Sequence, residues 1–184
     1  DAKLLEDLYE SFKANGATLN KDDKEKYRKL SMDLSMLTLQ FDQNALKDKN
    51  RFELLITDEN ELSGLPESAR DAAAMLAKSK DKNGWLFNLS APSYIPFMRY
   101  SDKRDLREKM YREYMSVGNK GDEFDNKDII KKIVNIRLEI AQLMGFKNYA
   151  EYALEHTMAK NSANVYKLLN QLLEAYKPIA INEY

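Results

Sequence analysis

The sequence predicts an all-α protein, mainly of antiparallel helices, with a minor two-stranded β element. Apolar residues recur at spacings of three and four along most of the chain, which is the pattern of helices that bury one face. Only two short runs, residues 51–57 and 85–89, alternate like strands. Six glycines and four prolines among 184 residues leave few breaks in this pattern. We therefore expect a single helical domain over residues 1–184, without internal repeats.

Two helices are expected at the start of the chain. The first has its apolar residues on one face and ends near Asn15 and Gly16, because glycine suits the left-handed position that follows a helix. The second covers about residues 21–47 as an amphipathic helix. Its apolar stripe consists of Tyr27, Leu30, Leu34, Leu37, Phe41 and Ala45.

A short helix over residues 63–80, with Pro66 near its start, separates the two strand-like runs. Asn83 and Gly84 are a strong turn signal in front of the second run. We expect the runs to pair as a small two-stranded sheet, and the sequence leaves its direction open.

The stretch over residues 90–101 holds two prolines and is predicted to be an extended connector. Ser101 is then predicted to N-cap a helix whose Leu106, Met110 and Tyr114 face inward. Residues 118–125 should form a loop.

Three more helices complete the pattern. The first, over about residues 129–144, carries two adjacent apolar stripes, which predicts burial on more than one side. Gly145 should follow it with positive φ, Asn148 should cap a short helix, and Ser162 should begin the last one. The residues of the two stripes are Ile129, Ile133, Ile136 and Ile140, and beside them Ile130, Val134 and Ala141.

The charge pattern excludes several classes of partner. Lys and Arg number 29 against 30 Asp and Glu, and the signs are interspersed, so no basic stripe suggests nucleic-acid binding. No apolar run approaches the roughly 20 residues that span a bilayer, so no membrane partner is expected. The chain starts without Met and in helical periodicity, and it ends without a capping glycine. These ends favour a piece of a longer protein.

The only histidine, His156, directly follows Glu155. A zincin needs two histidines one turn apart with a glutamate as general base, and neighbouring residues point about 100° apart on a helix. We therefore interpret His156 as a polar or partly buried structural residue. Without cysteine or a second histidine, the residues single out no catalytic and no metal-binding position.

Two weaker signals remain. The acidic loop over residues 121–128 could chelate calcium, but it lacks the ordered spacing of an EF-hand, and Asp125 is better placed to N-cap the next helix. Asn88 to Ser90 match a glycosylation sequon, a motif too short to carry weight. No P-loop, dinucleotide-binding fingerprint or nucleophile elbow is present.

A set of motifs follows in order along the whole chain. The longest is IRLEIAQLMGFKNYAEYALEHTMAKN, residues 136–161, and others are ELSGLPES, residues 61–68, and YIPFMRYSDKRDLREKMYREY, residues 94–114. Shorter matches run from Phe12 to Leu19 and from Phe41 to Asn44. Together these segments resemble the thimet-oligopeptidase-like zinc metallopeptidase family, which includes oligopeptidase A and peptidyl-dipeptidase (dipeptidyl carboxypeptidase). The resemblance favours the peptidyl-dipeptidase branch.

The resemblance implies that this chain is a noncatalytic fragment of the N-terminal half, part of a helical wall beside a channel for short peptides. The family's H-E-x-x-H helix and downstream glutamate have no counterpart here and would lie after Tyr184. Zinc would thus belong to the full-length parent, with no cofactor, no catalytic residue and no activity in this fragment. The residues that bind substrate are unknown.

The expected partners are short peptides and the C-terminal catalytic segments of the parent, and the exposed apolar stripes predict self-association of the fragment. We expect a cytoplasmic protein, with the periplasm as the alternative. A rival hypothesis is a self-sufficient helical interaction module that binds partner helices.

Overall fold

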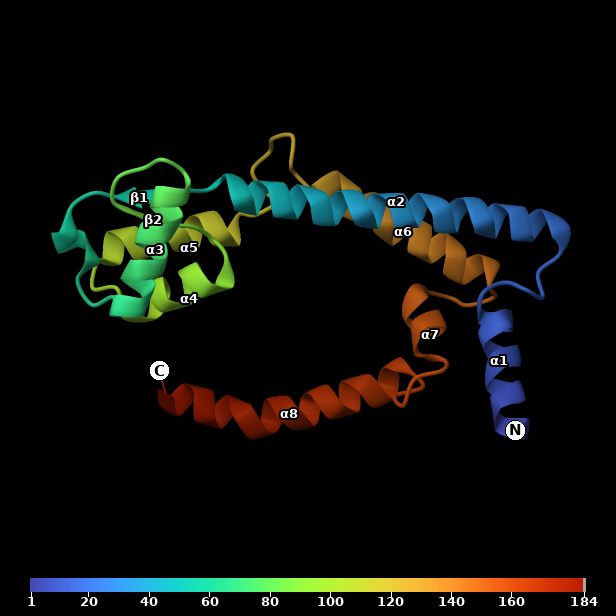
Figure 1. Ribbon diagram of the computed structural model, residues 1–184. Helices are drawn as coiled ribbons and strands as arrows, with labels where there is room; N and C mark the ends of the chain where they lie inside the picture. Colours follow the sequence, from blue (N-terminus) through green and yellow to red (C-terminus); the bar gives the residue numbers. More distant parts are fainter. Residues whose placement is uncertain (184) are drawn as a thin grey trace. The chain divides into compact units, whose positions relative to one another are not determined.

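The computed structural model describes residues 1–183, and its chain forms two compact units. One unit comprises Asp1–Leu37 together with residues from Lys132 onward, and the other comprises Thr38–Lys131. Within residues 1–183 the structure has eight α-helices and one two-stranded sheet, so the predicted mainly helical class is confirmed (Figure 1). The single domain over residues 1–184 stays a prediction. No helix in the described part of the chain is long and apolar enough to cross a membrane.

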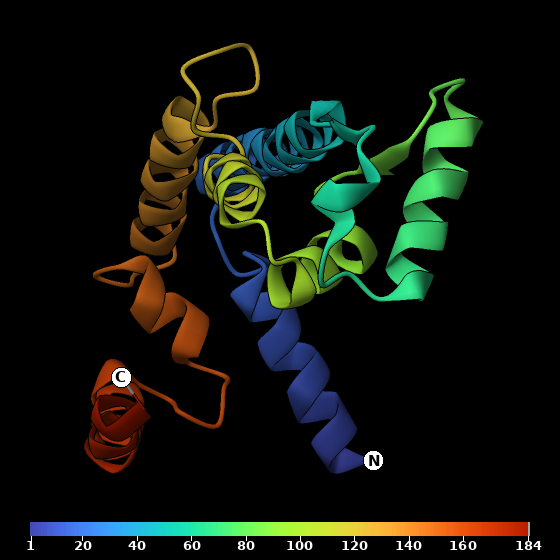
Figure 2. The same ribbon diagram turned by 90° about the vertical axis from the view of Figure 1, so that its left-hand side faces the viewer.

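The Thr38–Lys131 unit holds the sheet. It contains the end of α2 (Lys21–Arg51), β1 (Leu54–Ile56), the 3₁₀ helix η1 (Glu59–Leu62), α3 (Glu67–Ser79), β2 (Trp85–Phe87), α4 (Ala91–Tyr100) and α5 (Arg104–Met115). The strands pair antiparallel, with Leu54 opposite Phe87 and Ile56 opposite Trp85, which settles the direction that the sequence left open. Helices α3, α4 and α5 lie around this ribbon, as Figure 2 also shows.

The core of this unit lies between the ribbon and the helices. Phe87 of β2 and Phe97 of α4 are both buried, and their rings meet edge-to-face at 4.7 Å between centroids. Such a pair contributes about 0.5–1.5 kcal/mol beyond its buried area. The other buried members of the cluster are Phe52, Leu54, Ile56, Leu62, Leu65, Ala73, Leu89 and Met110.

The predicted connector over residues 90–101 is wrong, because most of it forms α4. Pro92 lies in the first turn, where a helix has no use for its N–H, and Pro96 removes only one bond from the helix interior. Burial of Phe97 compensates for that bond. The predicted N-cap at Ser101 is also wrong, because Lys103 precedes α5 and Ser101 instead ends α4.

The other unit is built from helices alone. It contains α1 (Ala2–Ala14), the first part of α2, most of α6 (Lys127–Leu143), α7 (Tyr149–Leu154) and α8 (Ser162–Glu183). The predicted ends near Asn15 and Gly16, the cap at Asn148 and the start at Ser162 are confirmed. On α6, Ile129, Ile140 and Ala141 are buried, whereas Ile130 and Val134 are exposed. In the described residues this helix is therefore not covered along both stripes.

Gly145 ends α6 with φ of +88°, as predicted. Its N–H bonds the carbonyl of Gln142 at 3.0 Å, and the N–H of Phe146 bonds that of Ala141 at 2.8 Å, which is a Schellman motif. A Cβ built on Gly145 would meet nothing within 4 Å. The left-handed backbone alone therefore selects glycine here.

Replacing Gly145 with Ala is expected to lower the free energy of unfolding by about 1 kcal/mol, because an alanine must adopt the left-handed conformation. Asn tolerates this conformation better, so Gly145→Asn should cost less than Gly145→Ala. Urea denaturation followed by circular dichroism measures both. Equal stability of the Ala variant and the wild-type chain would contradict the argument.

Candidate functional site

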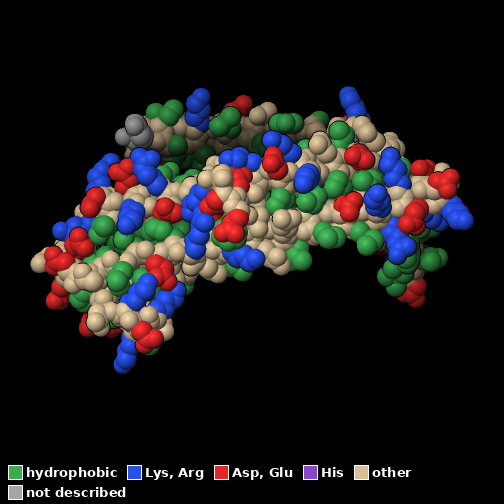
Figure 3. All heavy atoms as spheres, turned by 90° about the horizontal axis from the view of Figure 1, so that it is seen from above, with side chains coloured by type: hydrophobic (Ala, Val, Ile, Leu, Met, Phe, Trp, Pro, Cys, Tyr) green, Lys and Arg blue, Asp and Glu red, His purple; other side chains and the backbone are tan. Residues whose placement is uncertain are grey.

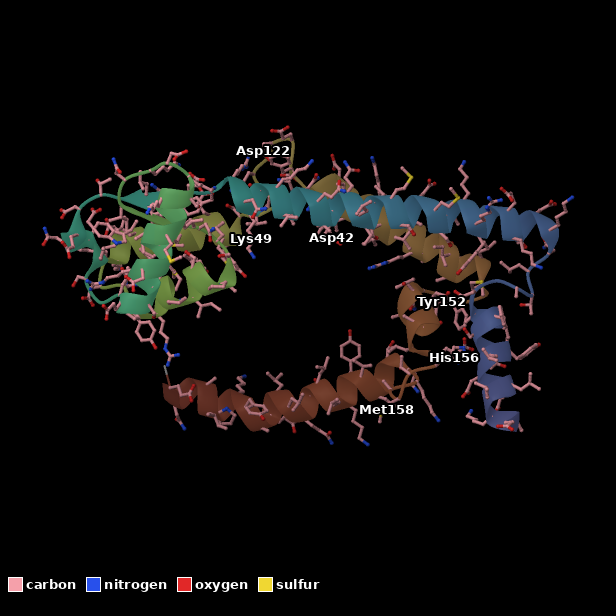
Figure 4. All side chains as sticks on the ribbon, in the orientation of Figure 1. Asp42, Lys49, Asp122, Tyr152, His156 and Met158 are labelled. Carbon is pink, nitrogen blue, oxygen red and sulfur yellow. The ribbon has the colours of Figure 1, made fainter. Side chains whose placement is uncertain are left out.

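His156 lies just after α7, and its side chain is about half exposed. Its Nε2 is 3.4 Å from a carboxylate oxygen of the neighbouring Glu155. Figure 4 places it beside α1, whose residues line the same open depression. One imidazole and one carboxylate do not supply the three protein ligands of a zinc site, and residues 1–183 contain no group of three or more His, Asp or Glu that could hold a metal. The donor set here does not fit zinc.

The acidic loop over residues 121–128 directs its carboxylates to protein donors. Asp125 accepts the N–H groups of Gly121 at 2.7 Å and of Lys127, the first residue of α6, at 2.9 Å, although Asn126 and not Asp125 directly precedes the helix. Asp122 bonds the guanidinium of Arg51 and accepts the N–H of Phe124. The carboxylates therefore do not converge on a common point. The bond between Arg51 and Asp122 attaches this loop, which connects α5 with α6, to the end of α2.

Three carboxyl groups of the Thr38–Lys131 unit have pKa values below their ordinary ones. The hydrogen bond from Arg51 lowers the pKa of Asp122, and the backbone N–H of Lys127 lowers that of Asp125. Hydrogen bonds from Lys80 and then Lys82 lower the pKa of Glu53. In each case the folded protein favours the ionised form.

Because the folded pKa values lie below the unfolded ones of about 4, these groups stabilise the fold above that pH and lose this contribution as the pH falls through their folded values. The thermal midpoint is therefore expected to drop between pH 5 and pH 3. Calorimetry at half-unit pH steps measures it. Glu53→Gln should reduce the dependence, and a midpoint unchanged down to pH 3 would contradict the assignment.

The most enclosed polar centre of the Thr38–Lys131 unit is Asp48, on the last turns of α2. Its carboxylate is fully buried and accepts the N–H of Gly118 at 2.7 Å. Lys120 Nζ lies 3.0 Å from it and Arg51 Nε 2.7 Å from it. Two cations and a backbone donor thus satisfy a carboxylate that would otherwise be very costly to bury.

A second buried polar contact lies next to Asp48, one turn earlier on α2. Asn44, one turn before Asp48, donates to the Oδ1 of Asn126 at 3.1 Å, and Asn126 donates to the carbonyl of Phe41 at 3.0 Å. Sequence reasoning missed both residues of α2. A signal was present, because Asn44 and Asp48 continue the three-and-four spacing of the apolar stripe through Phe41 and Ala45. A polar residue on an inward stripe indicates a buried, partnered group.

The sequon over residues 88–90 lies directly after β2. Asn88 accepts the N–H of Ser90 at 3.0 Å and its hydroxyl at 2.6 Å, so its amide is engaged in a local turn. This contact explains the residue types without a modification.

Exposed apolar residues gather on the terminal helices. Helix α8 has no buried residue over its 22 positions, and α1 has none over 13. The short α7 is better anchored, because the hydroxyl of Tyr152 donates to the carbonyl of Ala14 at 2.8 Å, and burial raises the pKa of this tyrosine. Figure 3 shows hydrophobic side chains among the charged ones on the surface of the chain. The exposed apolar residues of α8 are Tyr166, Leu168, Leu169, Leu172, Leu173, Tyr176, Ile179 and Ile181.

Comparison with known proteins identifies the relatives of this chain. Residues 97–184 match the profile of peptidase family M3. Oligopeptidase A of Haemophilus influenzae is 38% identical over 180 residues, which are 96% of this chain and 26% of the relative. A probable cytosolic oligopeptidase A of Arabidopsis thaliana is 40% identical over 164 residues, 85% of this chain and 23% of the relative. The dipeptidyl carboxypeptidase of Escherichia coli is 30% identical over 182 residues, 98% of this chain and 27% of the relative.

The chain spans about a quarter of the length of these curated relatives, so it corresponds to a segment of them. The oligopeptidase A relatives and the dipeptidyl carboxypeptidase are all peptidases by name. The match to the family profile includes the whole of α5, α6, α7 and α8. The family predicted from the ordered motifs is confirmed, since residues 97–184 match peptidase family M3 and proteins named oligopeptidase A and dipeptidyl carboxypeptidase are similar along nearly the whole chain.

Proposed function

We propose that this chain is a noncatalytic helical wall segment of a zinc-dependent oligopeptidase that hydrolyses short peptides. The observation that carries the proposal is the match to oligopeptidase A relatives over 96% of the chain, in a segment whose side chains do not fit a zinc site. Zinc and the base that activates its water would then be supplied by the H-E-x-x-H segment of the parent. This chain would contribute the frame on which that segment packs.

Of the two branches that the motifs suggested, the identities favour oligopeptidase A. The chain is 37–38% identical to bacterial proteins of that name and 26–30% identical to bacterial dipeptidyl carboxypeptidases. The proposal therefore takes the oligopeptidase branch and short peptides as the substrate class. A cytoplasmic location is part of the same proposal, supported by the Arabidopsis relative described as probably cytosolic.

The test combines residues 1–184 with the remainder of the Escherichia coli oligopeptidase A, from which the matching segment has been removed. We expect the chain alone to hold no stoichiometric zinc and to cleave no quenched-fluorescent peptide. Co-expression of the two pieces should restore cleavage that a chelator abolishes. The remainder alone is the control for background activity.

One tightly held zinc per isolated chain, or peptide turnover after clean purification, would overturn the noncatalytic assignment. A self-sufficient helical interaction module is the second candidate, favoured by the exposed apolar stripe of α8. That candidate predicts a chain that binds helical partners and never restores peptidase activity. The reading frame beyond codon 184 offers a separate check, since the proposal expects it to encode H-E-x-x-H.

A further inference from the structure

A shallow groove runs along α5 on the outside of the Thr38–Lys131 unit. Its volume is about 380 Å³, and every residue that lines it comes from α4 or α5. The lining residues are Met98, Arg104, Arg107, Glu108, Tyr111 and Arg112. Three guanidinium groups and one carboxylate therefore share a small space.

The charges of the groove leave a positive excess. Glu108 is bonded to Arg112, with its Oε1 2.8 Å from Nε and 2.7 Å from Nη2, so this carboxylate neutralises one arginine. Arg107 is partly buried and donates to the carbonyl of Ser101, which fixes its guanidinium in the groove. Arg104 has no ion pair or hydrogen bond from its side chain to any described residue. The surrounding stretch, residues 99–112, carries six basic and three acidic side chains in a chain of net charge −1.

Apolar side chains lie next to these arginines. Met98 of α4 is half-buried, and the ring of Tyr111 on α5 is half exposed. Nearby, Tyr94 and Tyr114 stack at 4.3 Å between ring centroids, which holds α4 and α5 together under the groove. The groove thus offers two guanidinium groups without a carboxylate partner beside a thioether and an aromatic ring.

This combination of arginines and apolar side chains suits the C-terminal residue of a peptide. The C-terminal residue of a peptide carries its carboxylate and its side chain on the same carbon, so both can be recognised in one small site. Arginine forks bind a carboxylate through parallel N–H bonds, and methionine and tyrosine adapt to apolar side chains of varied shape. The other charged residues of the stretch over residues 99–112 are of mixed sign, and they are Arg99, Asp102, Lys103, Asp105 and Lys109.

We propose that the groove binds the C-terminal residue of a short peptide, with the carboxylate on Arg104 and Arg107 and an apolar side chain against Met98 and Tyr111. The site rests on the proposed function, because it would hold the peptide substrate of the parent. It would act as a subsite of the wall that orients short chains by their free carboxyl end.

The test is fluorescence anisotropy of the full chain with an N-terminally labelled tetrapeptide that ends in leucine. We expect binding of the free acid and an affinity at least about tenfold lower for the C-terminal amide, which loses the charge-assisted bonds. Arg104→Gln should weaken binding of the free acid by a similar factor, because this side chain has no hydrogen bond or ion pair with a residue of the described part of the chain. Binding should also weaken as salt is added.

Arg28→Gln is the matched control, since Arg28 is an exposed arginine on α2 outside the groove. It should leave the affinity unchanged. Equal binding of acid and amide, or of Arg104→Gln and the wild-type chain, would overturn the proposal. An internal glutamate in an amidated peptide that binds as tightly as the free acid would overturn the assignment to the terminal carboxylate. These readouts need neither zinc nor turnover, so they fail or succeed independently of the peptidase assay.

Discussion

Replacing Asp48 with Ala is expected to lower the free energy of unfolding of its unit by about 3–5 kcal/mol, the usual cost of removing one partner from a buried ionic cluster. The change leaves the N–H of Gly118 without its acceptor, and it leaves Lys120 and Arg51 without their shared carboxylate. The loop over residues 116–126 should lose one of its attachments to α2, whereas the bonds of Asp122 with Arg51 and of Asn126 with Asn44 remain. Urea denaturation measures the global effect, and hydrogen exchange of the Gly118 amide measures the local one.

Asp42→Ala is the matched control on the same helix. Asp42 is exposed and lies six positions before Asp48, so its replacement should change stability by no more than about 0.5 kcal/mol. Asp48→Asn should fall between the two, because the amide oxygen can still accept the Gly118 bond while the charge is lost. An Asp48→Ala variant as stable as the control would show that the buried cluster contributes nothing net.

The second large effect concerns α8. The isolated chain is expected to self-associate through the stripe on this helix, because a soluble monomer rarely leaves so much contiguous apolar surface in water. Leu169→Glu combined with Leu172→Glu places two charges on the stripe and should weaken association at least about 100-fold. Size-exclusion chromatography with light scattering over a range of concentrations measures the change.

The control carries the same two charges on another face of α8, as Asn170→Glu combined with Gln171→Glu. This variant should associate like the wild-type chain. If the stripe also receives segments of the parent, the leucine variant should fail to restore peptidase activity in the co-expression assay, whereas the control should succeed. A wild-type chain that stays monomeric at all concentrations would refute the prediction.

Most of the helices could be predicted because their signals are local. Gly145 and Asn148 report the ends of helices through backbone preferences that hold whatever lies around them. The prediction of an extended connector around Pro92 and Pro96 was wrong because the outcome there depends on tertiary structure. The penalty of a proline depends on its position in the helix, and the burial of Phe97 that outweighs it is a tertiary effect.

The site was less accessible to sequence reasoning. Asp48 lies in a helix full of charged residues, and two of its three partners are 70 and 72 residues away. Only its place on the apolar stripe separates it from exposed neighbours such as Asp42. The groove on α5 was hidden as well, because Arg104 and Arg107 lie in an ordinary charged run until α4 brings Met98 beside them.

The long separation between Asp48 and Gly118 has a kinetic consequence. A contact that closes a loop of 70 residues carries an entropic cost, so we expect it to form late on the folding route. Bonds that are absent from the transition state leave the folding rate almost unchanged and act on the unfolding rate. The buried carboxylate of Asp48 should therefore chiefly slow unfolding. Its loss would raise the unfolding rate, and so shorten the lifetime of the folded state, far more than it would lower the folding rate.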